Sequence, residues 1–220
     1  MAEKAKARFD DLRPHRRRSF ALTNPIGTLV AREIDEVHDV IGQAEGAVAA
    51  GKWVAGFVAY EAAPAFDPSL AVVHHGLDET LPLAWFVLAE GRGRAEQPRA
   101  FFHQLSDWKP RLDPASYRQH FDEIRRLIRA GETYQVNFTF RLDAQFEGSP
   151  EGFYRRLVNS QAGGYGALLE TQGWAVASAS PELFFEWHNG RIVSKPMKGT
   201  RRRGLLVADD EIQRTELEGS

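Results

Sequence analysis

Apolar residues recur three or four positions apart in two long segments, which is the spacing of one helix face. The clearest set, between positions 113 and 131, consists of Tyr117, Phe121, Ile124, Leu127 and Ile128. Asp113 followed by Pro114 is typical of a helix beginning, and Gly131 of a helix end. A similar pattern predicts a helix from a cap at Asp35 to about Ala50.

Strands are predicted where the apolar residues form short runs or alternate with polar ones. Trp53–Tyr60 and Pro82–Ala89 are nearly continuous apolar runs between turn residues. Thr133–Leu142 alternates strictly, so its apolar residues share one face and Gln135, Asn137, Thr139 and Arg141 share the other.

The second half of the chain predicts a short helix after Ser149-Pro150 and then four strands, near 165–171, 174–179, 182–188 and 191–195. Gln172-Gly173 and Asn189-Gly190 separate them, and the second pair is a strong hairpin signal. Helices combined with an antiparallel meander predict an α+β fold in which helices pack on antiparallel sheets.

Composition narrows the functional classes. The 220 residues include 28 Lys and Arg against 30 Asp and Glu, a net charge of −2, so no overall field attracts nucleic acid or acidic membranes. The chain has no cysteine, which excludes disulfides, thiol catalysis and cysteine-bound metals. No apolar run has the length of a signal peptide core or a membrane span. We therefore expect a soluble, cytoplasmic protein.

The chain is expected to divide at 91–113, a polar stretch with several glycines and prolines. Residues 1–18 are highly charged and predict a flexible N-terminal arm. Residues 19–105 then form an N-terminal subdomain, and residues 112–220 the first part of a second domain.

Three features could carry chemistry. The polar face of 133–142 is either an ordinary wetted face or a pocket wall that binds a polar ligand. Glu182, at a predicted strand start, is either a surface carboxylate or a general acid and base.

The third feature is the basic run from Lys195 to Gly204, which has five basic residues in ten. It could be a solvated loop, a phosphate-binding or RNA-binding segment, or the site of a lysine nucleophile. An amine attacks only when neutral, so Lys198 would need a lowered pKa, and Lys195, Arg201 and Arg202 are the cations that could lower it.

Four blocks, taken in order, resemble the chorismate-binding enzyme family. They are GFVAYEAAPAFDP at 56–68, GETYQVN at 131–137, SPELFF at 180–185 and PMKGTRRRG at 196–204. The first block is similar to the N-terminal region of the family's aminodeoxychorismate synthase branch. The resemblance covers about residues 20–220 and implies a fold like that of anthranilate synthase component I.

Two positions separate the branches of that family. The resemblance implies that branches adding water to chorismate carry a lysine base where this chain has Gln135, a neutral amide. It also implies that anthranilate synthases carry alanine where this chain has Lys198, and aminodeoxychorismate synthases carry lysine. The branch that makes 4-amino-4-deoxychorismate for p-aminobenzoate and folate is therefore favoured.

By the same resemblance, Lys198 attacks ring carbon C2 of chorismate while Glu182 helps the C4 hydroxyl to leave. Ammonia then adds at C4 and releases the lysine. Gly199, Thr200, Gln135 and Asn137 are implied to bind the substrate. A separate glutamine amidotransferase subunit is implied as the ammonia source.

The family's sequence continues beyond position 220, where its Mg²⁺ ligands are expected. We therefore expect no complete metal site in these residues, a fold incomplete at the C-terminus, and little activity from the 220-residue chain alone. Exposed sheet edges would favour a homodimer. The alternatives are anthranilate synthase component I and a non-enzymatic module that binds anions or nucleic acid through residues 195–203 and 13–18.

Overall fold

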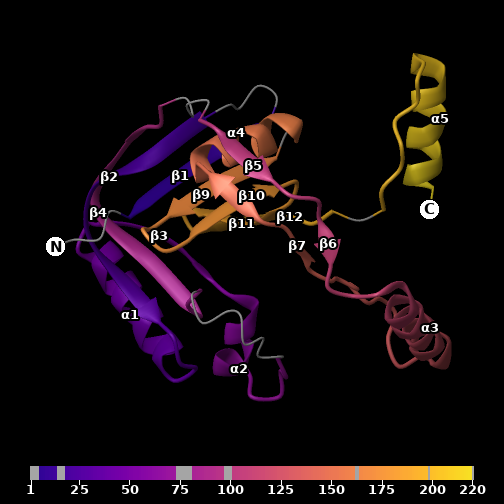
Figure 1. Cartoon of the computed structure of the whole chain (residues 1–220), viewed down its shortest axis with the longest axis horizontal. Coiled ribbons are helices and arrows are strands. Elements are labelled where there is room, and N and C mark those ends of the chain that lie inside the picture. Colours follow the sequence, from indigo (N-terminus) through magenta and orange to yellow (C-terminus); the bar gives the residue numbers. More distant parts are fainter. Residues whose placement is uncertain are drawn as a thin grey trace. The chain divides into compact units, whose positions relative to one another are not determined.

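The computed structural model describes residues 5–13, 18–72, 81–96, 101–161, 164–197 and 199–219. The chain divides into two units, and Figure 1 labels their helices and strands. The larger unit contains residues 1–97 and 156–220, and the smaller unit contains residues 98–155.

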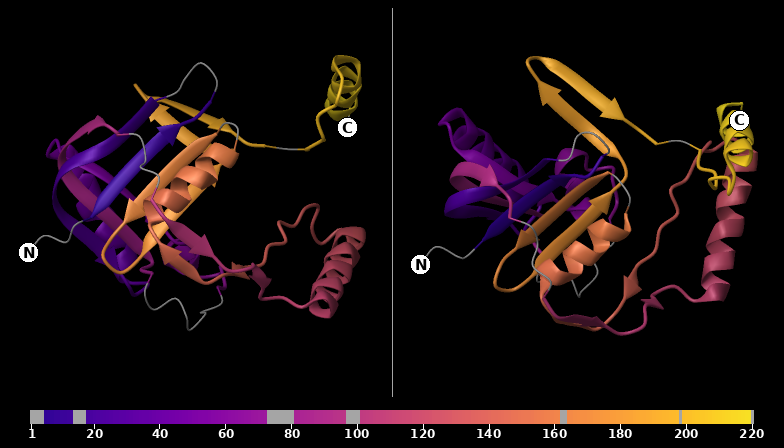
Figure 2. Two further views of the ribbon diagram at one scale, coloured as in Figure 1. Left: turned by 45° about the horizontal axis from the view of Figure 1, so that its top comes forward. Right: turned by 90° about the horizontal axis from the view of Figure 1, so that it is seen from above.

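A six-stranded antiparallel sheet, in the order β10-β9-β1-β2-β4-β3, forms the centre of the larger unit. Its strands come from distant parts of the sequence, and in Figure 2 the indigo strands lie beside orange strands from the second half of the chain. The strands are β1 (Lys6–Asp11), β2 (Arg18–Ala31), β3 (Trp53–Val58), β4 (Ala84–Arg94), β9 (Tyr165–Glu170) and β10 (Ala175–Ser180).

Two apolar clusters form the core of this unit. One joins Trp85 and Val87 of β4 to Leu169 of β9, with Trp174 packed edge-on against Trp85 at 5.0 Å between ring centroids. The other lies under α1 (Glu36–Ala49), whose Val37 and Val40 are buried. The 3₁₀ turn η1 (Tyr60–Ala62) contributes Ala62 to this second cluster, and α2 (Ala63–Phe66) follows it.

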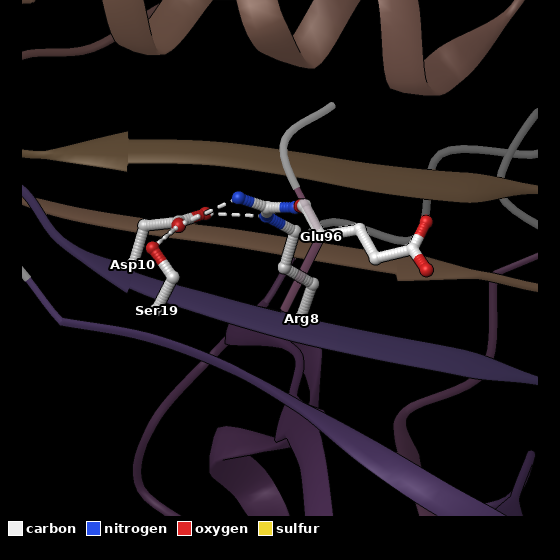
Figure 3. A network of polar contacts seen from close by, with 4 residues as sticks. All are labelled: Arg8, Asp10, Ser19 and Glu96. Atoms are coloured by element: carbon white, nitrogen blue, oxygen red, sulfur yellow. Dashed lines mark hydrogen bonds and ion pairs between the residues drawn. The ribbon is translucent and has the colours of Figure 1, made fainter. Parts of the chain in front are cut away.

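A buried ion pair joins two residues of the same strand, Arg8 and Asp10 of β1 (Figure 3). The Arg8 guanidinium donates to both Asp10 carboxylate oxygens, at 2.7 and 2.9 Å, and the Ser19 hydroxyl from β2 donates to the same carboxylate. Arg8 also donates to the backbone carbonyl of Glu96. The Arg8 and Asp10 side chains are 13% and 3% exposed, so the charges are largely removed from water but fully hydrogen-bonded to each other.

A hairpin of β11 (Leu183–His188) and β12 (Arg191–Lys195) follows the sheet. Asn189 and Gly190 both have positive φ, 51° and 75°, as a type I′ turn requires. The chain continues to α5 (Val207–Glu218).

The smaller unit holds α3 (Pro114–Ala130) and two short strand pairs. The Asp113 side chain accepts from the Ala115 and Ser116 amides, and Gly131 ends the helix with φ of 78°. The strand pairs are β5 (His103–Leu105) with β8 (Phe146–Gly148), and β6 (Lys109–Pro110) with β7 (Leu142–Asp143). Helix α4 (Pro150–Ser160) begins in this unit and ends in the larger one.

The predicted α+β class with antiparallel sheets is confirmed. Both predicted helix segments, the short helix at 150 and the four strands of the second half are also present. The Asp35 side chain makes no cap hydrogen bond. Instead, the Glu36 carboxylate accepts from the Arg32 and Glu33 amides.

Two predictions about local structure were wrong. Residues 6–11, expected in a flexible arm, form β1 between β2 and β9, because pairing on both sides satisfies their backbone groups. Residues 133–141, expected in a strand, have no regular structure, because no described strand pairs with them and only Leu142 enters β7.

The compact units also differ from the contiguous parts expected from the sequence. Strands β9 and β10 come late in the chain but join β1 and β2 in one sheet. The segment 98–155 is then set apart as a unit of its own.

Candidate active site

Glu182 lies in the larger unit, in the turn between β10 and β11. The Ser180 hydroxyl donates to the Glu182 carbonyl at 3.0 Å, and the Glu182 amide returns a bond to that hydroxyl at 3.3 Å. This local turn fixes the backbone at the end of β10, and the residue itself is exposed. The carboxylate is therefore accessible to a ligand.

Gly199 and Thr200 follow β12 in the same unit and are exposed, without regular structure. Lys198, the expected nucleophile, lies outside the described residues. Among the described residues, no hydrogen bond or ion pair joins Glu182 to Gly199 or Thr200. Their expected roles stay predictions.

Gln135 and Asn137 belong to the smaller unit. Both are exposed and lie in the irregular segment before β7. The Thr133 hydroxyl donates to the Gln135 carbonyl at 3.1 Å, which holds a local turn. The polar strand face expected here is absent, so their substrate-binding role stays a prediction that rests on the motif alone.

The basic run is better defined, because its arginines lie along α5. The Arg203 guanidinium binds both carboxylate oxygens of Asp210, at 2.6 and 2.5 Å. The Gly204 amide donates to Asp210 at 2.9 Å. Arg201 forms an ion pair with Glu216, nearer the end of the helix.

These ion pairs change the expected electrostatics. Arg201 was expected to help lower the pKa of the lysine nucleophile, but its charge is compensated by Glu216. Lys195 and Arg202 make no ion pair with a described residue and are the cations still available for that role. The pairing also weakens the alternative of a free anion-binding run, because two of its three consecutive arginines are already engaged by carboxylates.

Two cavities flank the contact between the basic run and α5. One, of about 360 Å³, is lined by Arg202, Arg203, Gly204, Leu205, Asp209, Ile212 and Gln213. The other, of about 310 Å³, is lined by Arg201, Arg202, Arg203, Asp210, Gln213, Arg214 and Leu217. Sequence reasoning missed Asp210 and Gly204 at this contact. The signal available was a glycine directly after the arginines and an acidic segment shortly beyond it.

Mg²⁺ takes oxygen ligands, usually including one or two carboxylates. No group of three or more His, Asp or Glu side chains in the described ranges lies close enough together to hold a metal ion. The expectation of Mg²⁺ in the complete enzyme stays a prediction.

Comparison with known families decides the class of this chain. A model of the chorismate binding enzymes matches residues 92–220, more than half of the sequence. The chain belongs to the chorismate-binding enzyme family. The matched segment includes GETYQVN, SPELFF and PMKGTRRRG, the three family blocks that follow position 92.

The relatives within the chorismate-binding family include two enzyme types. The chain is 31% identical over 105 residues to aminodeoxychorismate synthase component 1 of Salmonella typhimurium, covering 48% of this chain and 23% of that protein. It is 40% identical over 102 residues to aminodeoxychorismate synthase of Streptomyces pristinaespiralis, covering 46% and 14%. It is 32% identical over 97 residues to anthranilate synthase component 1 3 of Haloarcula marismortui, covering 44% and 19%. The chain thus matches about a quarter or less of the length of these relatives.

No helix in the described part of the chain has both the length and the apolar character needed to cross a bilayer.

Proposed function

We propose that this chain carries the nucleophile-bearing part of an aminodeoxychorismate synthase component I. The observation that supports the proposal is Lys198 in PMKGT, inside the segment that matches the family. Gln135 in the same segment argues against water addition, since a neutral amide does not activate water as a base.

The proposed reaction has two steps. The neutral Lys198 amine bonds to C2 of chorismate, both ring double bonds shift, and the C4 hydroxyl leaves as water after taking a proton from Glu182, which then takes one proton from the new lysine–carbon ammonium. Ammonia then bonds to C4, both double bonds shift back, and the C2–nitrogen bond to lysine breaks, so that the proton lost by the added ammonia ends on the released lysine. The product is 4-amino-4-deoxychorismate, and covalent catalysis divides one difficult displacement into two easier ones.

The remaining residues would bind the substrate. Gly199 and Thr200 would contact chorismate through backbone and hydroxyl, and Gln135 and Asn137 through their amides. Lys195 and Arg202 would favour the neutral lysine by charge repulsion. Ammonia would come from a glutamine amidotransferase subunit. Mg²⁺ is proposed for the complete domain, and none of these steps runs through an ion held by the described residues.

The first experiment traps the covalent step. The chain replaces the segment that it matches in the Salmonella enzyme, this chimera is mixed with chorismate and Mg²⁺ without ammonia, and its intact mass is measured. We expect an adduct equal to chorismate minus water, mapped to Lys198 and absent in Lys198→Ala. The matched control Lys195→Ala removes a nearby cation but should keep an adduct. An adduct that persists in Lys198→Ala would overturn the assigned nucleophile.

The second experiment identifies the product. Because the match spans about a quarter of the Salmonella enzyme, a chimera replaces that segment with the matching residues of this chain. With chorismate, Mg²⁺ and ammonia we expect 4-amino-4-deoxychorismate, and a loss of about 10²- to 10⁴-fold on Glu182→Gln. A folded chimera that makes fluorescent anthranilate instead would favour the anthranilate synthases, which are also among the relatives.

A further inference from the structure

One carboxylate joins the basic run to the first turns of α5. Asp210 accepts two hydrogen bonds from the Arg203 guanidinium and one from the Gly204 amide. Its side chain is 29% exposed, although that of Arg203 is 87% exposed. We call Arg203, Gly204 and Asp210 the α5 clasp.

The clasp also requires a glycine. A Cβ atom on Gly204 would lie 2.1 Å from the Asp210 amide nitrogen and 2.4 Å from the Asp209 carbonyl carbon. Both are backbone atoms of α5, so any side chain at 204 would push the segment off the helix. The backbone of 204 and the helix are therefore in direct contact.

A second contact sets the direction of the segment. Arg201 pairs with Glu216, and Arg203 with Asp210. The segment 201–204 therefore runs antiparallel to α5. From Asp210 to Glu216 the helix rises about 9 Å, and from Arg201 to Arg203 an extended chain spans about 7 Å. The two lengths are close, and long arginine side chains readily span the difference.

We propose that Asp210 is a positioning residue that anchors, through Arg203 and Gly204, the segment following the family's PMKGT block. Gly199 and Thr200, proposed above to bind chorismate, stand four or five positions before the anchored glycine. This inference rests on the proposed function. It adds Asp210, which lies outside that block, as a residue that determines how tightly chorismate is bound.

The ion pair by itself would be too weak for this role. Exposed pairs contribute little, and salt screens them. The α5 clasp differs because the same carboxylate also binds a backbone amide at a point of backbone contact. Asp210 therefore fixes main chain as well as a flexible side chain.

The experiment uses the full chain and three independent measurements. Amide hydrogen exchange reports the Gly204 amide, titration calorimetry reports chorismate binding, and denaturant unfolding reports the stability of the core. Asp210→Asn removes the charge that holds Arg203, and Gly204→Ala removes the close approach. The matched controls are Glu211→Gln, next in α5, and Gly173→Ala, at a turn with open space around the glycine.

We expect the amide of residue 204 to lose protection from hydrogen exchange in both clasp variants. We also expect both variants to bind chorismate about ten- to a hundredfold more weakly, because small displacements of binding groups have effects of this size. The unfolding midpoint of the core should stay that of the parent chain, and both controls should match it in all three measurements. If Asp210 only stabilised the fold, Asp210→Asn would lower the unfolding midpoint, and the folded variant would bind chorismate as the parent chain does.

The outcomes separate the two hypotheses. If the amide of residue 204 keeps its protection from exchange in Asp210→Asn, the clasp is refuted, whatever the affinity of that variant for chorismate. Lost protection with unchanged chorismate affinity refutes the positioning role. If the parent chain binds no chorismate, the positioning role fails and the exchange data decide the clasp alone, while the product made by the chimera decides the proposed function.

Discussion

The buried Arg8–Asp10 pair gives the sharpest test of the fold. Asp10→Ala would leave the Arg8 guanidinium, 13% exposed, without the carboxylate that binds it twice. Removing one partner of a buried ion pair costs about 3–5 kcal/mol, because the other charge stays buried without its counter-charge. The Ser19 hydroxyl would lose its acceptor as well. We therefore expect Asp10→Ala to reduce the free energy of unfolding by about 4 kcal/mol.

Replacing both charges should cost much less. In Arg8→Met with Asp10→Leu no charge remains buried, and such exchanges are often neutral or stabilising by about 1–4 kcal/mol. Guanidinium chloride unfolding, followed by far-UV circular dichroism, measures both variants.

The control is Glu123→Gln on α3, where the ion pair with Arg126 is about half exposed and should contribute nothing measurable. A loss below about 1 kcal/mol in Asp10→Ala, or an equal loss in the double variant, would show that burial of this charge does not govern the stability of the sheet.

Three further variants test the core, the hairpin and a helix cap. Trp85→Ala, at a side chain that is 2% exposed, should lower the free energy of unfolding by about 3–5 kcal/mol in the same assay. Gly190→Ala should destabilise by about 1 kcal/mol relative to Gly173→Ala, because only Gly190 has positive φ; equal stability of the two would contradict the turn. Hydrogen bonds from the Ser116 hydroxyl and from backbone amides lower the pKa of Asp113. The stabilisation that the Asp113 carboxylate gives to α3 is therefore complete above the ordinary carboxyl pKa and is lost as the pH falls through the lowered pKa of Asp113. Far-UV circular dichroism should show that α3 loses helix content at acid pH in the parent chain, and that this loss is absent in Asp113→Ala.

Much of the fold could be predicted where the signals are local. The ends of α3 follow from Asp113, Pro114 and Gly131, and the β11–β12 hairpin follows from Asn189-Gly190. These residues act on neighbours a few positions away. Their effect is therefore visible in a short stretch of sequence.

The missed elements depend on distant partners or irregular strands. Strand β1 carries Arg8 and Asp10, which suggest a wetted segment until Ser19 and the sheet enclose them. Strand β2 contains Pro25 and a register shift between Pro25 and Gly27. Both interrupt the alternation of apolar and polar residues by which a strand is predicted from sequence. Residues 133–141 show the reverse error, because alternation predicts a strand only where a partner supplies hydrogen bonds.

Some residues of the candidate site could be predicted from local motifs, and others depend on contacts that form only in the folded chain. The motif residues Glu182 and Lys198 could be named from the sequence, because each lies in a short block typical of the family. Asp210 could not, since its role comes from a contact with Arg203 and Gly204 formed only when α5 folds back along the basic run.

The position of β1 also sets an order of assembly. Lys6 is paired with Glu170, so the middle of the sheet is completed by residues that lie far apart in the sequence. During synthesis β1 cannot pair with β9 until the chain has been made past position 170, and contacts of such long range make folding slow. A ribosome paused before position 165 would present β1 with an open edge, available to any other extended segment nearby.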